Sequence, residues 1–90
     1  MRKIAIFTVA AVTFVAASAQ ADSLGKPCTS APQAQWLPIA QLQAKVEAQG
    51  YKVQKAKLKN ACGELYTIDK NGNRVELFVD PTNGLIIGQM

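Results

Sequence analysis

Cys28 and Cys62 are the residues with the clearest chemical potential in this sequence. They are its only two cysteines, so an oxidising compartment would favour one intramolecular disulfide between them. That bond would close a loop of roughly 35 residues, which a chain-entropy argument values at about 3–4 kcal/mol. Two free thiols or a disulfide-linked dimer remain as alternatives. A zinc site is disfavoured, because the sequence has no histidine and two thiolates supply half of a zinc shell.

Residues that could serve catalysis do not form a recognisable catalytic set. Without histidine there is no imidazole base and no Cys–His or Ser–His pair. Glu64 and Glu76 are the one pair of carboxylates that a hairpin could bring together, and on a small sheet we expect them to be surface charges opposite Lys or Arg. The sequence therefore predicts no catalytic residue, no metal and no cofactor, in a protein that is not an enzyme.

The first 21 residues have the pattern of an export signal. A basic start precedes an uncharged run over residues 4–19, and Ala19-Gln20-Ala21 offers small residues for cleavage before Asp22. Ala17-Ser18-Ala19 is a second possible cleavage site. A permanent membrane anchor is the competing interpretation, but the run is shorter than the ~20 apolar residues that span a bilayer. We expect a cleaved signal peptide over 1–21 and a periplasmic or secreted protein that leaves the membrane.

Charge and length limit what the mature chain can be. Removal of the signal takes away two basic residues and no acidic one, which lowers the net charge from +4 to +2. A nucleic-acid partner would call for a stronger basic surface, and export argues against it as well. The 69 residues that remain of the 90 make one domain at most. Domains of this size often need a covalent cross-link or a bound metal for stability, and the disulfide would supply such a cross-link.

A leader arm and a helix are expected at the start of the mature chain. Residues 22–35 contain almost no bulky apolar side chain and are predicted to be a flexible arm, held at Cys28. The next residues have the spacing of an amphipathic helix, and Gly50 suits the left-handed position that ends it. A helix of about three turns is marginal alone, so it must pack on a sheet.

The first strand is expected over residues 51–59. Its apolar pattern changes phase by one residue near Gln54, which indicates a bulge or a late strand start. Four lysines lie between residues 52 and 59, and three of them share one side of the strand. This stripe is either a basic binding surface or, as we prefer, a solvated face that keeps an exposed strand unpaired.

A hairpin is expected around Asn71-Gly72, because these residues separate two alternating runs. A two-residue loop would place Tyr66 on the same face as Leu77, toward the helix. A three-residue loop with Gly72 in a left-handed conformation would place Leu65 there instead. A one-residue slip therefore decides which aromatic side chains are buried. The two strands are expected over 62–68 and 74–79.

A tight turn and a short closing segment complete the chain. Asp80 opens the turn, Pro81 presets its φ, and Gly84 is free to adopt a left-handed conformation before the apolar residues 85–87. The sequence thus predicts an α+β domain, with one amphipathic helix packed on a three- to four-stranded antiparallel sheet. The expected core is Ile39, Leu42, Val46, Val53, Ala56, Leu58, Leu65, Val75, Leu77 and Val79.

This order of motifs resembles the PepSY domain. The similarity covers about residues 36–87 of a domain assigned to 36–90, and its most specific part runs from Asp80 to Gly84, just after an alternating strand. PepSY domains are associated with propeptides of thermolysin-like secreted peptidases and with small exported proteins. The resemblance implies the three-residue loop, no catalytic residues, and a partner that is a protein, such as a peptidase. Gly63 departs from the pattern, which usually has an aromatic there.

The three-residue loop has a consequence for the face of the sheet opposite the helix. It makes Tyr66, Ile68 and Phe78 point away from the helix together with Cys62, while Cys28 holds the arm beside them. We hypothesise that this apolar surface, partly covered by the arm, receives a protein partner. The alternative is that the arm or the closing strand completes a second small core there.

A second function hypothesis is a small-ligand or peptide-binding module. It would use a groove between the helix and the sheet, lined by Trp36, Tyr51 and Leu58.

Overall fold

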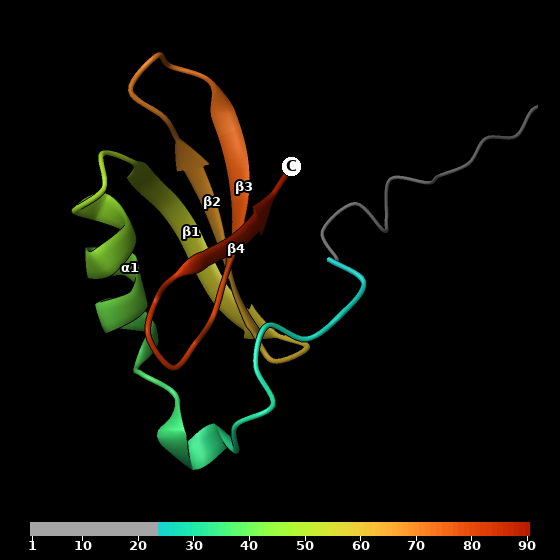
Figure 1. Ribbon diagram of the computed structural model, residues 1–90. Coiled ribbons are helices and arrows are strands. Elements are labelled where there is room, and N and C mark those ends of the chain that lie inside the picture. The colour runs from blue at the N-terminus through green and yellow to red at the C-terminus, as the bar shows by residue number, and fades with distance from the viewer. Residues whose placement is uncertain (1–23) are drawn as a thin grey trace, which may run out of the picture.

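The computed structural model describes residues 24–90. The predicted signal peptide and its cleavage site lie outside the described residues. The elements are a 3-10 turn η2 (Gln33–Gln35), the helix α1 (Ile39–Glu47) and the strands β1 (Lys52–Lys59), β2 (Cys62–Ile68), β3 (Arg74–Val79) and β4 (Ile86–Gln89). The strands form an antiparallel sheet in the order β1-β2-β3-β4, and α1 packs on one of its faces (Figure 1). The α+β prediction is confirmed.

The helix α1 is short and depends on its buried side. Leu42 and Val46 are fully buried against the sheet, as the apolar spacing predicts. After the helix, the N–H of Gly50 donates to the carbonyl of Glu47, and Gly50 has a φ of 103°. Glycine adopts this left-handed conformation without a steric penalty, so it ends the helix as expected.

The sheet register confirms the bulge and the three-residue hairpin loop. The pairing of β1 with β2 shifts between Val53 and Lys55, which leaves Gln54 as the bulged residue. In the hairpin, Leu65 lies opposite Leu77. The loop residue Gly72 has a φ of 86°. Tyr66, Ile68 and Phe78 therefore point away from α1.

The main core lies between α1 and the sheet. Its fully buried members are Leu42, Val46, Leu65, Leu77 and Val79. Of the other expected core residues, Ile39, Val53, Ala56 and Val75 pack against these and are partly buried. The expectation that Leu58 lies in the core is wrong, since this residue is 37% exposed. It lies on the edge strand β1 opposite Gly63, which has no side chain to cover it.

Gly63 is closely surrounded on the helix side of the sheet. A Cβ atom at this position would lie 2.7 Å from Cγ2 of Val79 and 3.2 Å from Cδ1 of Leu42. Leu42 and Val79 thus occupy the space next to the glycine, at the position where the chain departs from the aromatic of the PepSY pattern.

We expect Gly63→Ala to lower the free energy of unfolding by about 1–3 kcal/mol, because the added methyl group overpacks the core. Urea denaturation would measure the loss. Gly88→Ala is the matched control: its new methyl would meet the end of the Leu24 side chain, at 2.8 Å from Cδ1, which can move away. A loss at Gly63 no larger than that at Gly88 would contradict the close packing described here.

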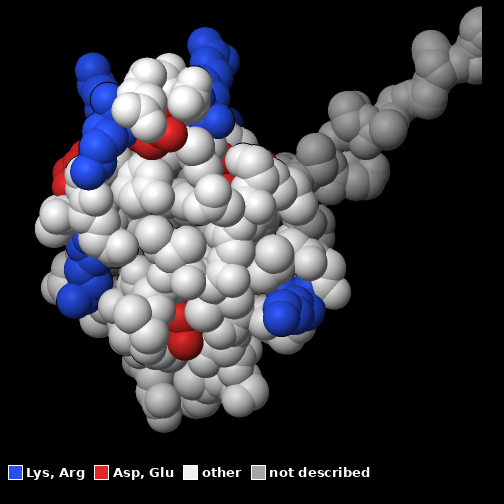
Figure 2. Space-filling view, turned by 45° about the horizontal axis from the view of Figure 1, so that its top comes forward, with Lys and Arg blue, Asp and Glu red and all other residues white. Residues whose placement is uncertain are grey.

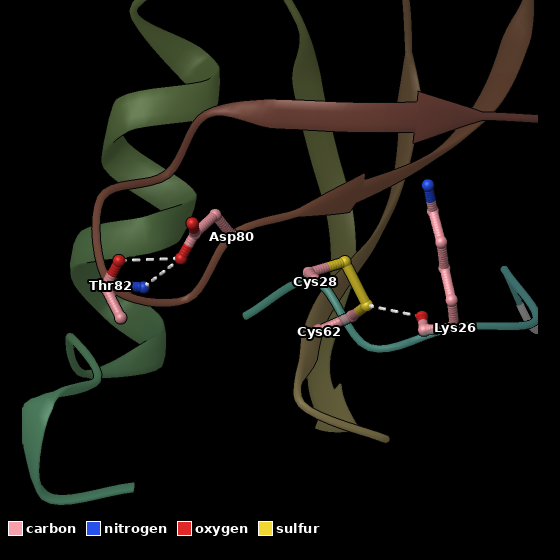
Figure 3. Close-up of a disulfide and its surroundings, with 5 residues drawn as sticks. All are labelled: Lys26, Cys28, Cys62, Asp80 and Thr82. Atoms are coloured by element: carbon pink, nitrogen blue, oxygen red, sulfur yellow. Dashed lines mark hydrogen bonds between the residues drawn. A yellow bond between two sulfur atoms is a disulfide. The ribbon is translucent and has the colours of Figure 1, made fainter. Parts of the chain in front are cut away.

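The turn after β3 forms as predicted and also holds the start of the helical segment. Oδ1 of Asp80 accepts hydrogen bonds from the N–H and the hydroxyl of Thr82, at 2.8 and 2.7 Å (Figure 3). Gly84 has a φ of 80°. The carbonyl of Pro81 accepts a hydrogen bond from the N–H of Leu37. The turn therefore fixes the chain just before α1.

Candidate functional site on the outer sheet face

The predicted disulfide between Cys28 and Cys62 is confirmed. It joins the arm to the first residue of β2 across a sequence separation of 34 residues. The N–H of Cys28 also donates to the carbonyl of Ala61, and Sγ of Cys62 lies 3.7 Å from the carbonyl oxygen of Lys26 (Figure 3). The arm thus runs beside the face of the sheet that points away from α1, called here the outer face.

Phe78 lies in a second small cluster beneath the arm. It is fully buried together with Cys62, beside Cys28, and Leu24 packs against this group. Leu24 also reaches over Gly88 of β4. For Phe78 the structure therefore agrees with the alternative that the arm completes a core. The contacts of Leu24 were not predicted, although it is the one large apolar residue of the arm.

Lysines from β1 extend over the middle of the outer face. Nζ of Lys57 lies 3.9 Å from Oε1 of Glu64. Nζ of Lys55 and Nζ of Lys57 lie 5.9 and 5.7 Å from the centroid of the Tyr66 ring, within the range of a cation–π contact. Glu64 was expected at the surface opposite a lysine. The ion pair exists, but the side chain of Glu64 is only 1% exposed, so the surface position is wrong.

The carboxylates of Glu64 and Glu76 share the outer face without being directly opposed. Glu64 lies opposite Phe78 and Glu76 lies opposite Tyr66, which makes the two acids diagonal neighbours across the hairpin. Among residues 24–90, no group of three or more His, Cys, Asp or Glu is placed to hold a metal ion.

An open pocket of about 260 Å³ lies toward the hairpin end of the sheet. Its lining consists of Gln54, Tyr66, Thr67, Arg74, Val75, Glu76 and Met90. Of the three residues in the partner-binding hypothesis, Tyr66 lines this pocket, Ile68 is half-buried outside it, and Phe78 is covered by the arm. The register brings the three onto one face, but they do not form one open patch.

The groove of the second hypothesis finds less support. The indole N–H of Trp36 donates to the carbonyl of Ala31, and Leu58 lies at the sheet edge. Tyr51 lines a different pocket of about 330 Å³ with the hairpin loop residues Lys70 and Asn71. This pocket includes neither Trp36 nor Leu58.

Comparison with protein families gives the family of the chain. The sequence model described as peptidase propeptide and YPEB domain, a PepSY model, matches residues 5–90. The chain belongs to the PepSY family. PepSY domains are typically non-catalytic, are mostly extracytoplasmic, and occur in propeptides and inhibitors of peptidases. Comparisons with curated proteins and with solved structures return no match. Over residues 24–90, no helix has the length and apolar character to cross a membrane.

The PepSY domain exposes its large apolar side chains mainly at one place. Leu85, Ile87 and Met90 are 61%, 42% and 54% exposed, and all three lie in or beside β4. Figure 2 shows a broad, mostly uncharged surface with lysine and arginine side chains at its margin and acidic side chains within it. From the sequence, residues 85–87 are expected only to be a closing strand or apolar tail. The signal that points to an exposed edge is the absence of any charged residue from 85 to 90.

Proposed function

We propose that this PepSY domain is an exported, non-enzymatic interaction module that binds or restrains a peptidase or another envelope protein. The observation that carries the proposal is the exposure of Leu85, Ile87 and Met90 together at one sheet edge. Exposed apolar groups gathered in one place are typical of protein-binding surfaces. Family membership supports a peptidase as the partner, because PepSY domains occur in peptidase propeptides.

Export is the second part of the proposal. The Cys28–Cys62 disulfide supports it, because such bonds persist outside the reducing cytosol. We expect mass spectrometry of the exported protein to find an N-terminus at Asp22 and a mass two hydrogen atoms below that of the reduced chain. A protein that retains Met1, or that has both thiols free, would contradict this part.

The direct test of the function is inhibition and capture with a defined partner. Purified, oxidised protein comprising residues 22–90 is immobilised, a periplasmic extract is passed over it, and the retained protein is identified and purified. Where the retained protein is a peptidase, we expect its activity to fall as the concentration of the oxidised domain rises. Leu58→Ser, which changes an exposed apolar residue at the opposite sheet edge, should retain binding. Failure of both capture and inhibition would overturn the proposed function.

A small-ligand or peptide-binding module is the second candidate. The observation in its favour is the pocket of about 260 Å³ beside Tyr66. Ligand pockets usually span about 300–1,000 Å³ and enclose most of the ligand. Two other pockets, of about 330 and 420 Å³, reach that range, but all three are open to solvent and would not enclose a ligand, so we rank this candidate second.

A further inference from the structure

Asn71 and Asn83 are each followed directly by a glycine. The sequence has four asparagines, and the other two precede Ala61 and Arg74. In an Asn-Gly pair the backbone nitrogen of the glycine can attack the side-chain amide carbon of the asparagine, because glycine has no side chain to hinder the approach. The chain therefore has two places where its own atoms could react with each other, and the structure distinguishes them.

The first pair lies at the tip of the hairpin between β2 and β3. Asn71 and Gly72 are both exposed. A Cβ atom at Gly72 would meet no atom within 4 Å apart from those of its chain neighbours. The backbone N–H of Asn71 donates to Oδ1 of Asp69, but among residues 24–90 no group forms a hydrogen bond with the side-chain amide of Asn71. This amide can rotate, and water can reach it.

The second pair is held inside the turn that follows β3. Oδ1 of Asn83 accepts a hydrogen bond from the N–H of Leu85 at 2.9 Å. Gly84 is buried, and its N–H donates to the carbonyl of Asp80 at 2.7 Å. A Cβ atom at Gly84 would lie 2.7 Å from Cδ of Lys45, so the side chain of Lys45 covers this glycine. Reaction at Asn83 would require the turn to come apart.

We propose that Asn71 is a site of spontaneous deamidation, with Gly72 as the nucleophile and water as the co-reactant. The nitrogen of Gly72 loses its proton to solvent and bonds to Cγ of Asn71, and the side-chain nitrogen leaves as ammonia. Water then opens the succinimide ring. Opening at Cγ gives aspartate, and opening at the main-chain carbonyl carbon gives isoaspartate, whose backbone runs through the former side chain. The modification does not depend on the proposed function.

The hydrogen bonds of Asp69 slow this reaction in the folded hairpin. The N–H of Gly72 donates to the carbonyl of Asp69 at 3.0 Å, so its nitrogen can react only when this bond opens. Oδ1 of Asp69 accepts the N–H groups of Asn71 and Asn73, both at 2.9 Å. Exposed loops open locally at a lower free-energy cost than core strands do. Asp69 therefore controls how often Gly72 is available.

The product changes the charge and the length of the hairpin loop. Asn71 lines a pocket of about 330 Å³ together with Asp69 and Lys70. Deamidation would add a second carboxylate to this lining, beside one cation. Isoaspartate would in addition lengthen the main chain of the loop that sets the pairing of Leu65 with Leu77. We therefore expect isoaspartate to weaken the hairpin more than aspartate does.

The test follows deamidation by mass spectrometry of the oxidised protein comprising residues 22–90, incubated in neutral buffer. Trypsin cleaves after Lys70 and Arg74, which places Asn71 and Asn83 in different peptides. In the folded protein we expect deamidation on the order of tenfold faster at Asn71 than at Asn83, because the side chain of Asn83 must first give up its hydrogen bond. Fragmentation of the tryptic peptide separates Asn71 from Asn73, which should stay intact because arginine follows it.

Two controls isolate the structural cause. In the reduced protein under denaturant, Asn71 and Asn83 should react at similar rates, because both are followed by glycine and neither is held by a turn. Asp69→Ala, which removes two hydrogen bonds from the loop, should speed the reaction at Asn71 in the folded protein and leave Asn83 unchanged.

Equal rates at Asn71 and Asn83 in the folded protein would overturn the inference. The same conclusion would follow if Asn71 stayed intact over a time in which the denatured chain reacts at both pairs. An Asp69→Ala variant with no change at Asn71 would contradict the control that we assign to Asp69.

Discussion

Phe78→Ala is expected to lower the free energy of unfolding by about 3–5 kcal/mol, although Phe78 lies on the sheet face opposite the helix. Its side chain is fully buried beside the disulfide and near Leu24, so truncation leaves a cavity under the arm. Small domains are stable by only about 0.05–0.15 kcal/mol per residue. This one substitution should therefore remove a large part of the stability, and urea denaturation would measure it.

Ile68→Ala is the control for that prediction. Ile68 points from the same strand pair to the same outer face but is only half-buried and lies outside the cluster. Its truncation should cost less than that of Phe78. Leu24→Ala should cause part of the stability loss expected for Phe78→Ala, because it removes a side chain that packs over the Phe78 cluster and leaves the phenyl ring in place. Equal losses at Ile68 and Phe78 would show that the arm does not complete a core.

The burial of Phe78 changes how the outer face can be tested for partner binding. A double change of Tyr66 and Phe78 to serine would lose stability through Phe78, so lost capture could not be assigned to a binding surface. Tyr66→Ser alone leaves the cluster beneath the arm intact. Preserved folding with lost capture would then assign a partner contact to the outer face.

Features encoded over a few neighbouring residues could be predicted from the sequence. Gly50, Gly72 and Gly84 all have positive φ values where helix or turn chemistry requires them. The phase change at Gln54 is a bulge, since a change of side-chain alternation is visible within one strand. The residues themselves left two hairpin registers open, and the resemblance to the PepSY domain selected the one observed, which places Tyr66, Ile68 and Phe78 on one face.

Burial could not be predicted where it depends on distant segments. Leu58 has an inward position in its strand, but it lies on the edge strand β1 and is not among the residues that pack against the main core. Glu64 lies on the outward side, yet it is buried where Lys57 lies over the sheet. Phe78 is covered by a residue that precedes it by more than fifty positions. The alternation of side chains along a strand shows to which face of the sheet each one points. It does not show which other segment of the chain covers that face.

The β4 edge was missed for a related reason. Exposed apolar residues at a chain end resemble, in sequence, a strand that completes a core. Ile86 does pack against the core, whereas Ile87 is the extra residue at a register shift in the pairing with β3 and is exposed. The shift depends on the pairing with β3, so the sequence of 85–90 alone did not reveal which isoleucine would remain outside.

Loss of the disulfide is the second large effect that we expect. In a Cys28→Ala/Cys62→Ala double variant, the unfolded chain regains the freedom of a loop of roughly 35 residues, worth about 3–4 kcal/mol. For a domain of this size, each kcal/mol moves the melting temperature by about 4–8 °C. The melting temperature should therefore fall by roughly 12–30 °C, which calorimetry or circular dichroism would measure.

The same variant separates the disulfide's effect on the unfolded chain from its effect on the arm. Reductant should lower the melting temperature of the native protein toward that of the double variant and leave the double variant unchanged. The arm retains the contact of Leu24 and the hydrogen bond from residue 28 to Ala61, but both must now compete with the freedom of an untethered segment. Phe78 should consequently become more accessible while the domain is still folded, because the covering residues are held mainly through Cys28. Hydrogen exchange at β3 and β4 in the double variant should then increase more than exchange in α1. A uniform increase across all elements would mean that the disulfide acts on the unfolded chain alone and that the arm stays in place without it.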